Sequence, residues 1–126
     1  MNIQRVEKNK RLSRAVVCGD KIYLGAQMPD DLSGGIVDQT RQVLAKVDEM
    51  LRHAGTSKAY LLSVTVLLKD LADFEGMNTA WDAWVDQERP PARCSFGNAA
   101  IGGPAPGYRV EMTAIAHIPQ DQVLQE

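Results

Sequence analysis

The segment Tyr108–His117 restricts the fold more than any other part of the chain, because two kinds of side chain alternate along it. In a β-strand, successive side chains point to opposite faces of the sheet. One face of this strand would carry only apolar side chains: Tyr108, Val110, Met112, Ala114 and Ala116. The other face would carry a mixed set: Arg109, Glu111, Thr113, Ile115 and His117. The sequence therefore predicts a sheet with one buried face and one face of mixed polarity.

The segment Leu61–Leu68 shows the same alternation. Its pattern predicts a buried set made of Leu62, Val64, Val66 and Leu68, and a mixed set made of Leu61, Ser63, Thr65 and Leu67. A face of the mixed kind is too apolar for open water and too polar for a dry core. We therefore expect other subunits of an oligomer to cover the mixed face.

Two further segments have the three- and four-residue spacing of amphipathic helices. The first is Ile36–Ala54, and Gly55 follows it where a C-terminal cap belongs. Its apolar stripe consists of Val43, Leu44, Val47, Met50, Leu51 and Ala54. We expect Asp73 to cap the second helix, which ends before Pro90-Pro91. One face of that helix would carry Phe74, Met77, Trp81, Trp84 and Val85.

The remaining strands are short. Gly19-Asp20 is a tight turn that predicts a hairpin between Ala15–Cys18 and Lys21–Gly25. Further strands are expected at Ile3–Glu7 and Ala92–Phe96. The resulting order, β-β-β-α-β-α-β-β, predicts an α+β fold with a single sheet and two helices packed on one face. We expect residues 1–126 to form one domain.

Composition argues against several classes of partner. The net charge of −2 and the pI of about 5.7 provide no field that would attract nucleic acid or anionic lipid. The chain lacks an apolar run of membrane-spanning length and an N-terminal signal peptide. Cys18 and Cys94 are isolated thiols without metal-ligand spacing. We therefore expect a cytoplasmic protein without a metal and without nucleic acid or membrane partners.

Arg93 and Glu111 are the first candidates for function, because each is a charged residue within a predicted half-buried strand. Such residues are seldom buried without a partner or a ligand. If Arg93 shares the mixed face with Glu111, the two would converge in a cleft between subunits. The alternative is that they form an ion pair that closes the interface.

Several segments together resemble the Rid family of reactive-intermediate deaminases, also called the YjgF or endoribonuclease L-PSP family. The resemblance covers nearly the whole chain, and the YoaB-like branch is the most similar. The segments that carry it are Gln27-Met28-Pro29, the helix segment Asp73–Trp84 with its Asn-Thr-Ala-Trp-Asp-Ala-Trp run, Pro91-Ala92-Arg93-Cys94-Ser95, and Val110–Ala116.

The resemblance implies a chorismate-mutase-like α+β fold and a homotrimer with a central sheet barrel and three pockets between subunits. It also implies a 2-iminobutanoate/2-iminopropanoate deaminase-like hydrolase. Such an enzyme hydrolyses short-lived enamines and imines, for example 2-aminoacrylate, to 2-keto acids and ammonia. The implied partner is a small imino acid that carries a carboxylate, and no cofactor is needed.

The resemblance also implies roles for individual residues. Arg93 matches the family's carboxylate-binding arginine, whose planar guanidinium can bind a carboxylate through two parallel hydrogen bonds. Glu111 matches the acidic residue near the attacking water, where it would orient that water or pass its proton to the departing ammonia. Asn78, Cys94 and Ser95 match positions at the substrate. Asn78 has a surface position as its alternative, and Cys94 has packing as a small apolar residue.

The chain departs from the family pattern in three places. Arg11-Leu12-Ser13-Arg14 lacks the family's tyrosine, and Gly25 stands where many members have serine. The segment from Arg93 to Glu111 is longer than usual, and its Gly102–Gly107 loop is either a rim over the pocket or a plain connector. These departures leave a metabolite-binding or regulatory trimer without turnover as the second interpretation. An endoribonuclease is the third, disfavoured by the absence of a basic patch and of a histidine pair.

Overall fold

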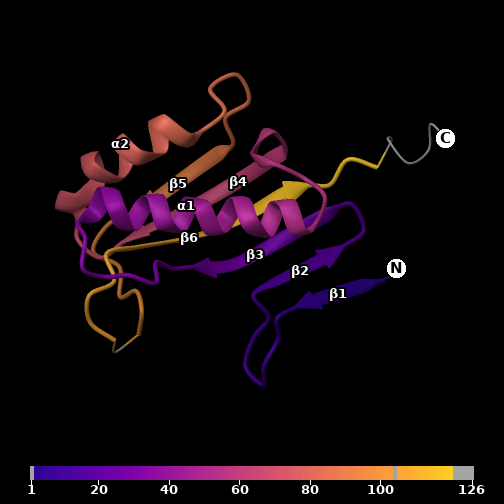
Figure 1. The fold of residues 1–126 in the computed structure, drawn as a ribbon, viewed down its shortest axis with the longest axis horizontal. Coiled ribbons are helices and arrows are strands. Elements are labelled where there is room, and N and C mark those ends of the chain that lie inside the picture. The colour runs from indigo at the N-terminus through magenta and orange to yellow at the C-terminus, as the bar shows by residue number, and fades with distance from the viewer. Residues whose placement is uncertain (1, 104, 121–126) are drawn as a thin grey trace.

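The computed structural model describes residues 2–103 and 105–120, which form a six-stranded sheet with two α-helices (Figure 1). The strand order is β1-β2-β3-β6-β4-β5, and every neighbouring pair is antiparallel except β4 and β5. The strands are β1 (Ile3–Val6), β2 (Ala15–Cys18), β3 (Lys21–Gln27), β4 (Leu61–Leu68), β5 (Ala92–Phe96) and β6 (Val110–His117). The helices are α1 (Ile36–His53) and α2 (Phe74–Trp84), with short 3-10 turns η1 (Lys58–Tyr60) and η2 (Leu71–Asp73).

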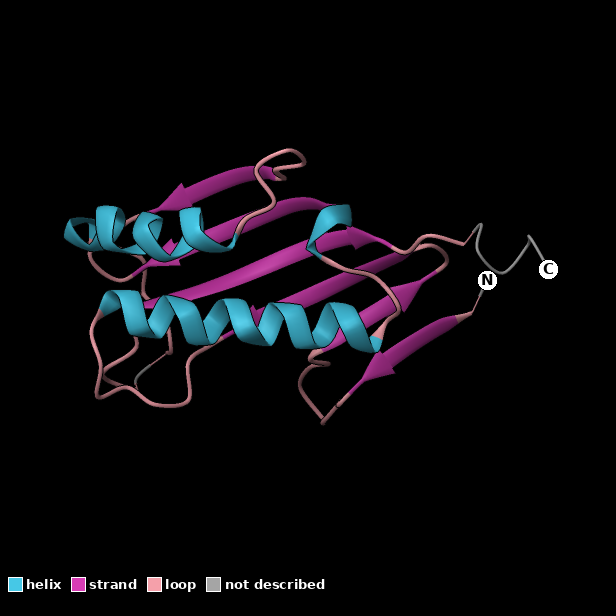
Figure 2. Cartoon of the chain, turned by 45° about the horizontal axis from the view of Figure 1, so that its top comes forward, coloured by secondary structure: helices cyan, strands magenta, loops and turns pink. Residues whose placement is uncertain are grey.

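Both helices lie on the same face of the sheet, which confirms the predicted α+β arrangement (Figure 2). The buried core fills the space between the helices and this face. Strand β6 contributes the predicted alternate residues Val110, Met112, Ala114 and Ala116, whereas Tyr108, the first residue of the predicted set, precedes the strand and is only partly buried. Opposite them lie Val43, Leu44, Val47, Met50 and Leu51 of α1 and Met77, Ala80 and Trp81 of α2. Burial of these side chains is the main force that holds the helices to the sheet.

The predicted sides of the first two residues of β4 are wrong. Leu61 is buried, with 6% of its surface exposed, whereas Leu62 is 44% exposed. The cause is a shift of register, because Leu61 lies opposite Ala116 of β6 and Ser63 lies opposite Ile115. Two residues of β4 thus face one residue of β6, which is a β-bulge. Beyond the bulge the alternation of β4 follows the prediction.

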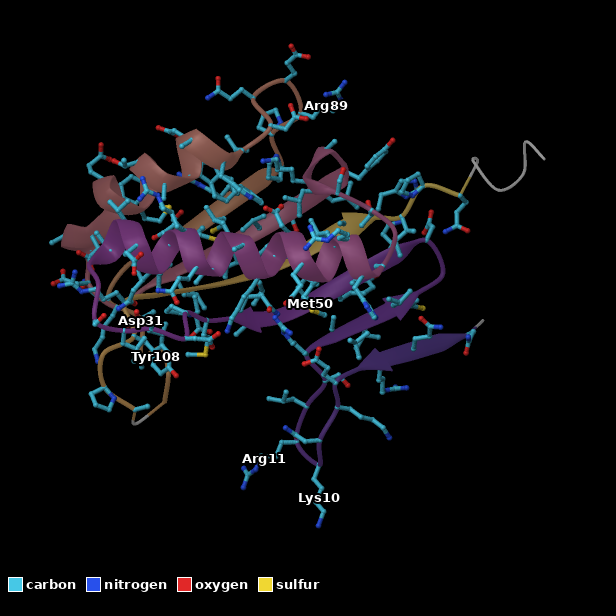
Figure 3. The ribbon with its side chains drawn as sticks, in the orientation of Figure 1. Lys10, Arg11, Asp31, Met50, Arg89 and Tyr108 are labelled. Carbon is cyan, nitrogen blue, oxygen red and sulfur yellow. The ribbon has the colours of Figure 1, made fainter. Side chains whose placement is uncertain are left out.

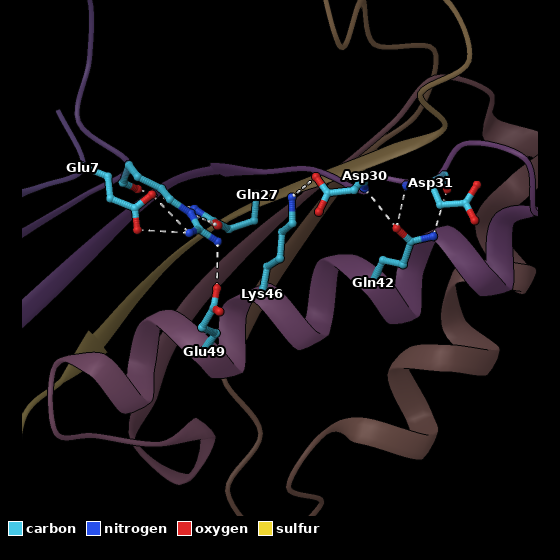
Figure 4. Close-up of polar contacts among 8 residues, drawn as sticks. Glu7, Gln27, Asp30, Asp31, Gln42, Lys46 and Glu49 are labelled. Carbon is cyan, nitrogen blue, oxygen red and sulfur yellow. Dashed lines mark hydrogen bonds and ion pairs between the residues drawn. The ribbon is translucent and has the colours of Figure 1, made fainter. Parts of the chain in front are cut away.

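Strand β3 continues two residues past its predicted end at Gly25, to Gln27. A second register shift separates Leu24 from Gln27, and the side chain of Gln27 turns into the protein. Its amide donates to the Gly25 carbonyl at 3.0 Å, and its Oε1 accepts from Arg14 Nε at 3.2 Å. Arg14 also pairs with Glu49 of α1 at 3.2 Å (Figure 4). This network joins the β1–β2 loop to helix α1.

The predicted C-terminal cap of α1 is confirmed. Gly55 has a φ of +83°, and its N–H donates to the Arg52 carbonyl at 3.0 Å. The N–H of Thr56 donates to the Leu51 carbonyl, also at 3.0 Å. These two bonds are those of a Schellman motif, which favours glycine because other residues are strained at positive φ.

The predicted capping bond of α2 is wrong, although Asp73 does occupy the N-cap position. Within the described residues, the Asp73 side chain makes no capping hydrogen bond, and its Oδ2 lies 3.9 Å from Arg109 Nε. The preceding turn η2 is capped instead by Asp70, which accepts from Ala72 N–H at 2.9 Å. The capping aspartate therefore lies one 3-10 turn earlier than the helical pattern indicates.

The second face of the sheet carries the predicted mixed set except Leu61, which is buried, and Arg109, which precedes β6. No other element of the described chain covers this face (Figure 2). Tyr23 and Phe96 are exposed there, and Ile115 is partly exposed at its centre. Within the described ranges, no helix has the length and apolar character needed to cross a membrane. The exposed side chains of Tyr23 and Phe96 and the partly exposed side chain of Ile115 lie on this one face of the sheet.

Replacing Gly55 by alanine should lower the free energy of unfolding by about 1 kcal/mol, because an L-residue is strained in the left-handed region. Gly55→Asn is the matched control and should lose less, since asparagine tolerates this conformation. The measurement is urea unfolding of the three proteins at one fixed protein concentration. Equal stability of Gly55→Ala and the parent would contradict the assigned cap.

Candidate functional site

Arg93 lies on the edge strand β5, and its side chain is on the helix side of the sheet. Its neighbour on β4 is Val64, which belongs to the buried core. Arg93 Nη1 donates to Asn78 Oδ1 of α2 at 2.8 Å. The guanidinium carbon lies 5.0 Å from the ring centroid of Trp81 and 5.9 Å from that of Phe74. Arg93 is thus held between strand β5 and helix α2.

Helical spacing explains why these partners meet. Phe74, Asn78 and Trp81 follow one another at intervals of four and three residues, so they share one face of α2. Met77 lies beside them, with its sulfur 3.9 Å from Arg93 Nη1. One face of α2 therefore offers the guanidinium two aromatic rings and an amide oxygen.

Within the described residues, the hydrogen bonds of the Arg93 guanidinium all use Nη1, which leaves the N–H groups of Nε and Nη2 open to a ligand. Among the residues that the structure describes, no carboxylate pairs with Arg93, and its Nε and Nη2 have no hydrogen-bond partner. A guanidinium keeps its charge at all physiological pH values. Two adjacent N–H groups on one edge match the geometry of a carboxylate. Arg93 therefore presents a charged, unpaired edge that suits an anionic ligand.

Glu111 lies on the opposite face of the sheet from Arg93. Its neighbour on β4 is Leu67, a member of the mixed set, and its side chain is half-buried. Glu111 Oε1 accepts from the Gly102 N–H at 3.3 Å. The condition for convergence, that Arg93 shares this face, is not met. A single chain therefore does not bring Arg93 and Glu111 together.

The other predicted site residues divide between the two faces. Asn78 is joined to Arg93, as described above. Ser95 is on the helix side beside Val66, and its Oγ is buried without a hydrogen-bond partner in the described part of the chain. Cys94 is beside Thr65 on the mixed face, where it is exposed. Within one chain, Ser95 and Asn78 therefore accompany Arg93, whereas Cys94 does not.

The segment that lacks the family's tyrosine forms the tip of the β1–β2 loop. Asn9 Oδ1 accepts from the backbone N–H of Arg11 at 2.7 Å and from that of Leu12 at 3.0 Å, which shapes the tip. Leu12 is 60% exposed, and Lys10 and Arg11 point away from the helices (Figure 3). At Gly25, a Cβ would lie 3.3 Å from the Arg14 carbonyl oxygen, so the backbone is close there.

Sequence reasoning missed Gln39, which holds the long loop before β6. Its side chain is 1% exposed; Nε2 donates to the Gly107 carbonyl at 3.0 Å, and Oε1 accepts from the Arg109 N–H at 2.9 Å. The ring of Tyr108 packs against Gly102, where an added Cβ would lie 2.5 Å from the ring. Gln39 lies four residues before Val43 on the buried stripe of α1, and a polar residue there is the signal that could have revealed it.

Both ends of the Gly102–Gly107 loop are held by hydrogen bonds. Gly102 is held by Glu111 of β6, and Gly107 is held by Gln39 near the start of α1. Within the described residues, no group of three or more histidine, cysteine, aspartate or glutamate side chains is arranged to hold a metal ion.

Replacing Gln39 by leucine should leave the Arg109 N–H and the Gly107 carbonyl unpaired, at a cost of about 1–3 kcal/mol. Hydrogen exchange of the Arg109 amide should accelerate accordingly. Gln42→Leu is the matched control, because Gln42 accepts from the Asp31 N–H at 2.9 Å and supports a different loop. Unchanged exchange at Arg109 in Gln39→Leu, or equal acceleration in both variants, would contradict the role of Gln39.

Comparison with known proteins places this geometry in a family. A family model described as endoribonuclease L-PSP matches residues 2–118. The RutC family protein YoaB of Escherichia coli K12 is 34% identical over 118 residues, which are 94% of this chain and 100% of YoaB. The 2-iminobutanoate/2-iminopropanoate deaminase of Capra hircus is 34% identical over 110 residues, covering 82% of this chain and 77% of that protein.

A solved structure shows the same fold. NMB1025 of Neisseria meningitidis, described as a member of the YjgF protein family, superposes with a TM-score of 0.89. It is 33% identical in sequence, with coverage of 95% of this chain and 98% of NMB1025. The sequence match over nearly the whole chain and the agreement of the two folds lead to one conclusion: the chain belongs to the endoribonuclease L-PSP family, also called the Rid or YjgF family.

Proposed function

We propose that the protein is a hydrolytic deaminase that converts 2-imino acids and their enamine forms to 2-keto acids and ammonia. The single observation that carries the proposal is the Nε and Nη2 edge of Arg93, which has no hydrogen-bond partner among the described residues and is held against helix α2. Family membership supports the reaction class, since relatives from Capra hircus and Bos taurus, 34% and 33% identical, are named 2-iminobutanoate/2-iminopropanoate deaminases.

Arg93 would bind the substrate carboxylate through the two N–H groups of its open edge. Such charge-assisted pairs are short and about twice as strong as neutral hydrogen bonds. Because both groups are planar, the pair also sets the plane of the adjacent C=N bond. A lysine at this position would supply charge without fixing that plane.

The reaction adds water across the C=N bond. The water oxygen bonds to the imine carbon and one water proton moves to the nitrogen, which gives a carbinolamine. The carbinolamine hydroxyl then gives up its proton, the nitrogen takes one, and the C–N bond breaks to leave the keto acid and ammonia. An enamine such as 2-aminoacrylate first takes a proton on its terminal carbon and loses one from nitrogen, which gives the imine. These substrates are already reactive, so positioning of the water and the carbon supplies much of the rate. We assign to Glu111 the orientation of the water or the transfer of its proton.

Arg93 and Glu111 must come from different chains to act on one substrate, because one chain places them on opposite faces of its sheet. We propose a homotrimer in which the mixed faces of three sheets line a central barrel. The exposed Tyr23 and Phe96 and the partly exposed Ile115 support this arrangement, since side chains of this kind are favourable in a covered interface. Each pocket would then lie at a subunit boundary.

The second candidate is a metabolite-binding trimer without turnover. The specific observation in its favour is the loss of two polar groups, with Leu12 in the segment where the family has tyrosine and Gly25 where it often has serine. Binding through Arg93 would persist in such a protein, while hydrolysis would not. The endoribonuclease activity in the family's description is not proposed, because a chain with a net charge of −2 offers phosphates little attraction.

Arg93→Ala and Arg93→Lys should each reduce kcat/KM for 2-imino acids by about thirty-fold or more, because loss of one partner of such a charge pair costs about 2–5 kcal/mol. The assay follows keto-acid release from an imine generated in the same solution. Arg89→Ala is the matched control, since Arg89 is exposed and pairs only with Asp86 in the described residues. Parent-like turnover by Arg93→Ala would overturn the assignment.

Light scattering of the purified protein should give a molar mass of about three times the chain mass of 13.8 kDa. Mixed oligomers of Arg93→Ala and Glu111→Gln should regain activity that neither variant has alone, up to about a quarter of the parental value for random mixing in a cyclic trimer. The reason is that some boundaries pair an intact arginine with an intact glutamate. A stable monomer, or mixtures as inactive as the separate variants, would contradict a site shared between chains.

A further inference from the structure

We propose that Trp81 is a positioning residue, whose indole fixes the plane of the Arg93 guanidinium and thereby aims its open edge at the substrate carboxylate. This inference rests on the proposed function, because it assumes that Arg93 binds a carboxylate. It goes beyond that function by assigning a role in substrate affinity to a buried aromatic side chain that touches no substrate atom.

Two contacts limit the orientations open to the guanidinium. The Trp81 ring centroid lies 5.0 Å from the guanidinium carbon, within the range of a cation–π contact, and Trp81 is only 7% exposed. Asn78 Oδ1 takes one N–H of Nη1 at 2.8 Å. A ring contact and an in-plane hydrogen bond together restrict both the tilt and the rotation of the group. Nε and Nη2 then form the edge that is left for a ligand.

The ring of Phe74 is a weaker second support. Its centroid is 5.9 Å from the guanidinium carbon, near the limit of a useful cation–π contact. The nearer ring, the deeper burial and the larger π-face of tryptophan make Trp81 the principal support. Because Trp81 belongs to the core cluster, its position is set by packing and does not depend on a bound ligand.

The neighbouring indole has a different role. Trp84 Nε1 donates to Asp48 Oδ2 at 2.8 Å, and Lys58 Nζ lies 5.1 Å from the Trp84 ring centroid. The ring centroids of Trp81 and Trp84 lie 5.5 Å apart on helix α2. The described contacts of Trp84 do not include Arg93. Trp81 and Trp84 are the only two tryptophans of the sequence. Trp84 therefore provides a matched control within the same helix.

Removal of the Trp81 indole should weaken substrate binding more than it slows the chemical step. In Trp81→Leu the guanidinium gains freedom, so KM should rise by about three- to thirty-fold while kcat changes little. Trp81→Phe keeps an aromatic face and should recover most of the loss. Trp84→Phe should match the parent in both constants. A role of Trp81 in packing alone would not separate KM from kcat in this way.

Two measurements do not require turnover. In Trp84→Phe the only tryptophan is Trp81, so titration with pyruvate, a stable 2-keto acid, should change the emission with saturation. In Trp81→Phe the only tryptophan is Trp84, and pyruvate should leave its emission unchanged. In the ligand-free protein, the ring current of Trp81 should shift the Nε–H proton resonance of Arg93, and the shift should disappear in Trp81→Leu.

The outcomes separate this proposal from the deaminase assignment. Saturable emission from Trp81 and a shifted Arg93 resonance without any turnover would support the positioning role and overturn the deaminase function. Turnover with an unshifted Arg93 resonance, or with equal KM in Trp81→Leu and the parent, would overturn the positioning role alone. If Trp81→Leu does not fold, the emission comparison between Trp81→Phe and Trp84→Phe decides. Failure of the parent to bind pyruvate would overturn the positioning role.

Discussion

The covering of one sheet face by both helices is the constraint on which the rest of the structure depends. It places alternate residues of β6, and alternate residues of β4 beyond its bulge, in the core. It leaves the mixed face without cover in the described chain. It also brings α2 over the edge strand β5, so that Arg93 meets Asn78 and Trp81. The contacts that orient the guanidinium are therefore a consequence of how α2 packs, since Phe74, Asn78 and Trp81 all belong to that helix, and Arg93 itself remains exposed to solvent.

Much of the fold follows from the sequence because periodicity reports burial directly. The alternation in β6, the stripe of α1 and the cap at Gly55 needed no tertiary information. The errors in the sheet fall where the backbone departs from a regular period. The bulge at Leu62 reverses the sides of two leucines, and a second irregularity carries β3 past Gly25. Both depend on pairing with β6, a strand distant in sequence, so local pattern does not reveal them.

The site is less accessible from sequence than the fold. Residue type and family resemblance identified Arg93 and Asn78, and the structure joins them by a hydrogen bond. The face on which Arg93 lies was not predictable from alternation, because the apolar residues of strand β5, Ala92, Cys94 and Phe96, lie on the mixed face, whereas Arg93 and Ser95 lie on the helix side. The resulting separation of Arg93 from Glu111 makes the subunit boundary central to the mechanism proposed here.

The most direct test of the central claim is a crystal structure of the protein with a bound 2-keto acid. The account predicts a carboxylate in the plane of the Arg93 guanidinium, with oxygens about 2.7–2.9 Å from Nε and Nη2. Glu111 of a second chain should lie on the far side of the ligand. A keto acid bound elsewhere, for example in the groove of about 260 Å³ between α1 and α2 that Leu44, Ala80 and Trp84 line, would contradict it.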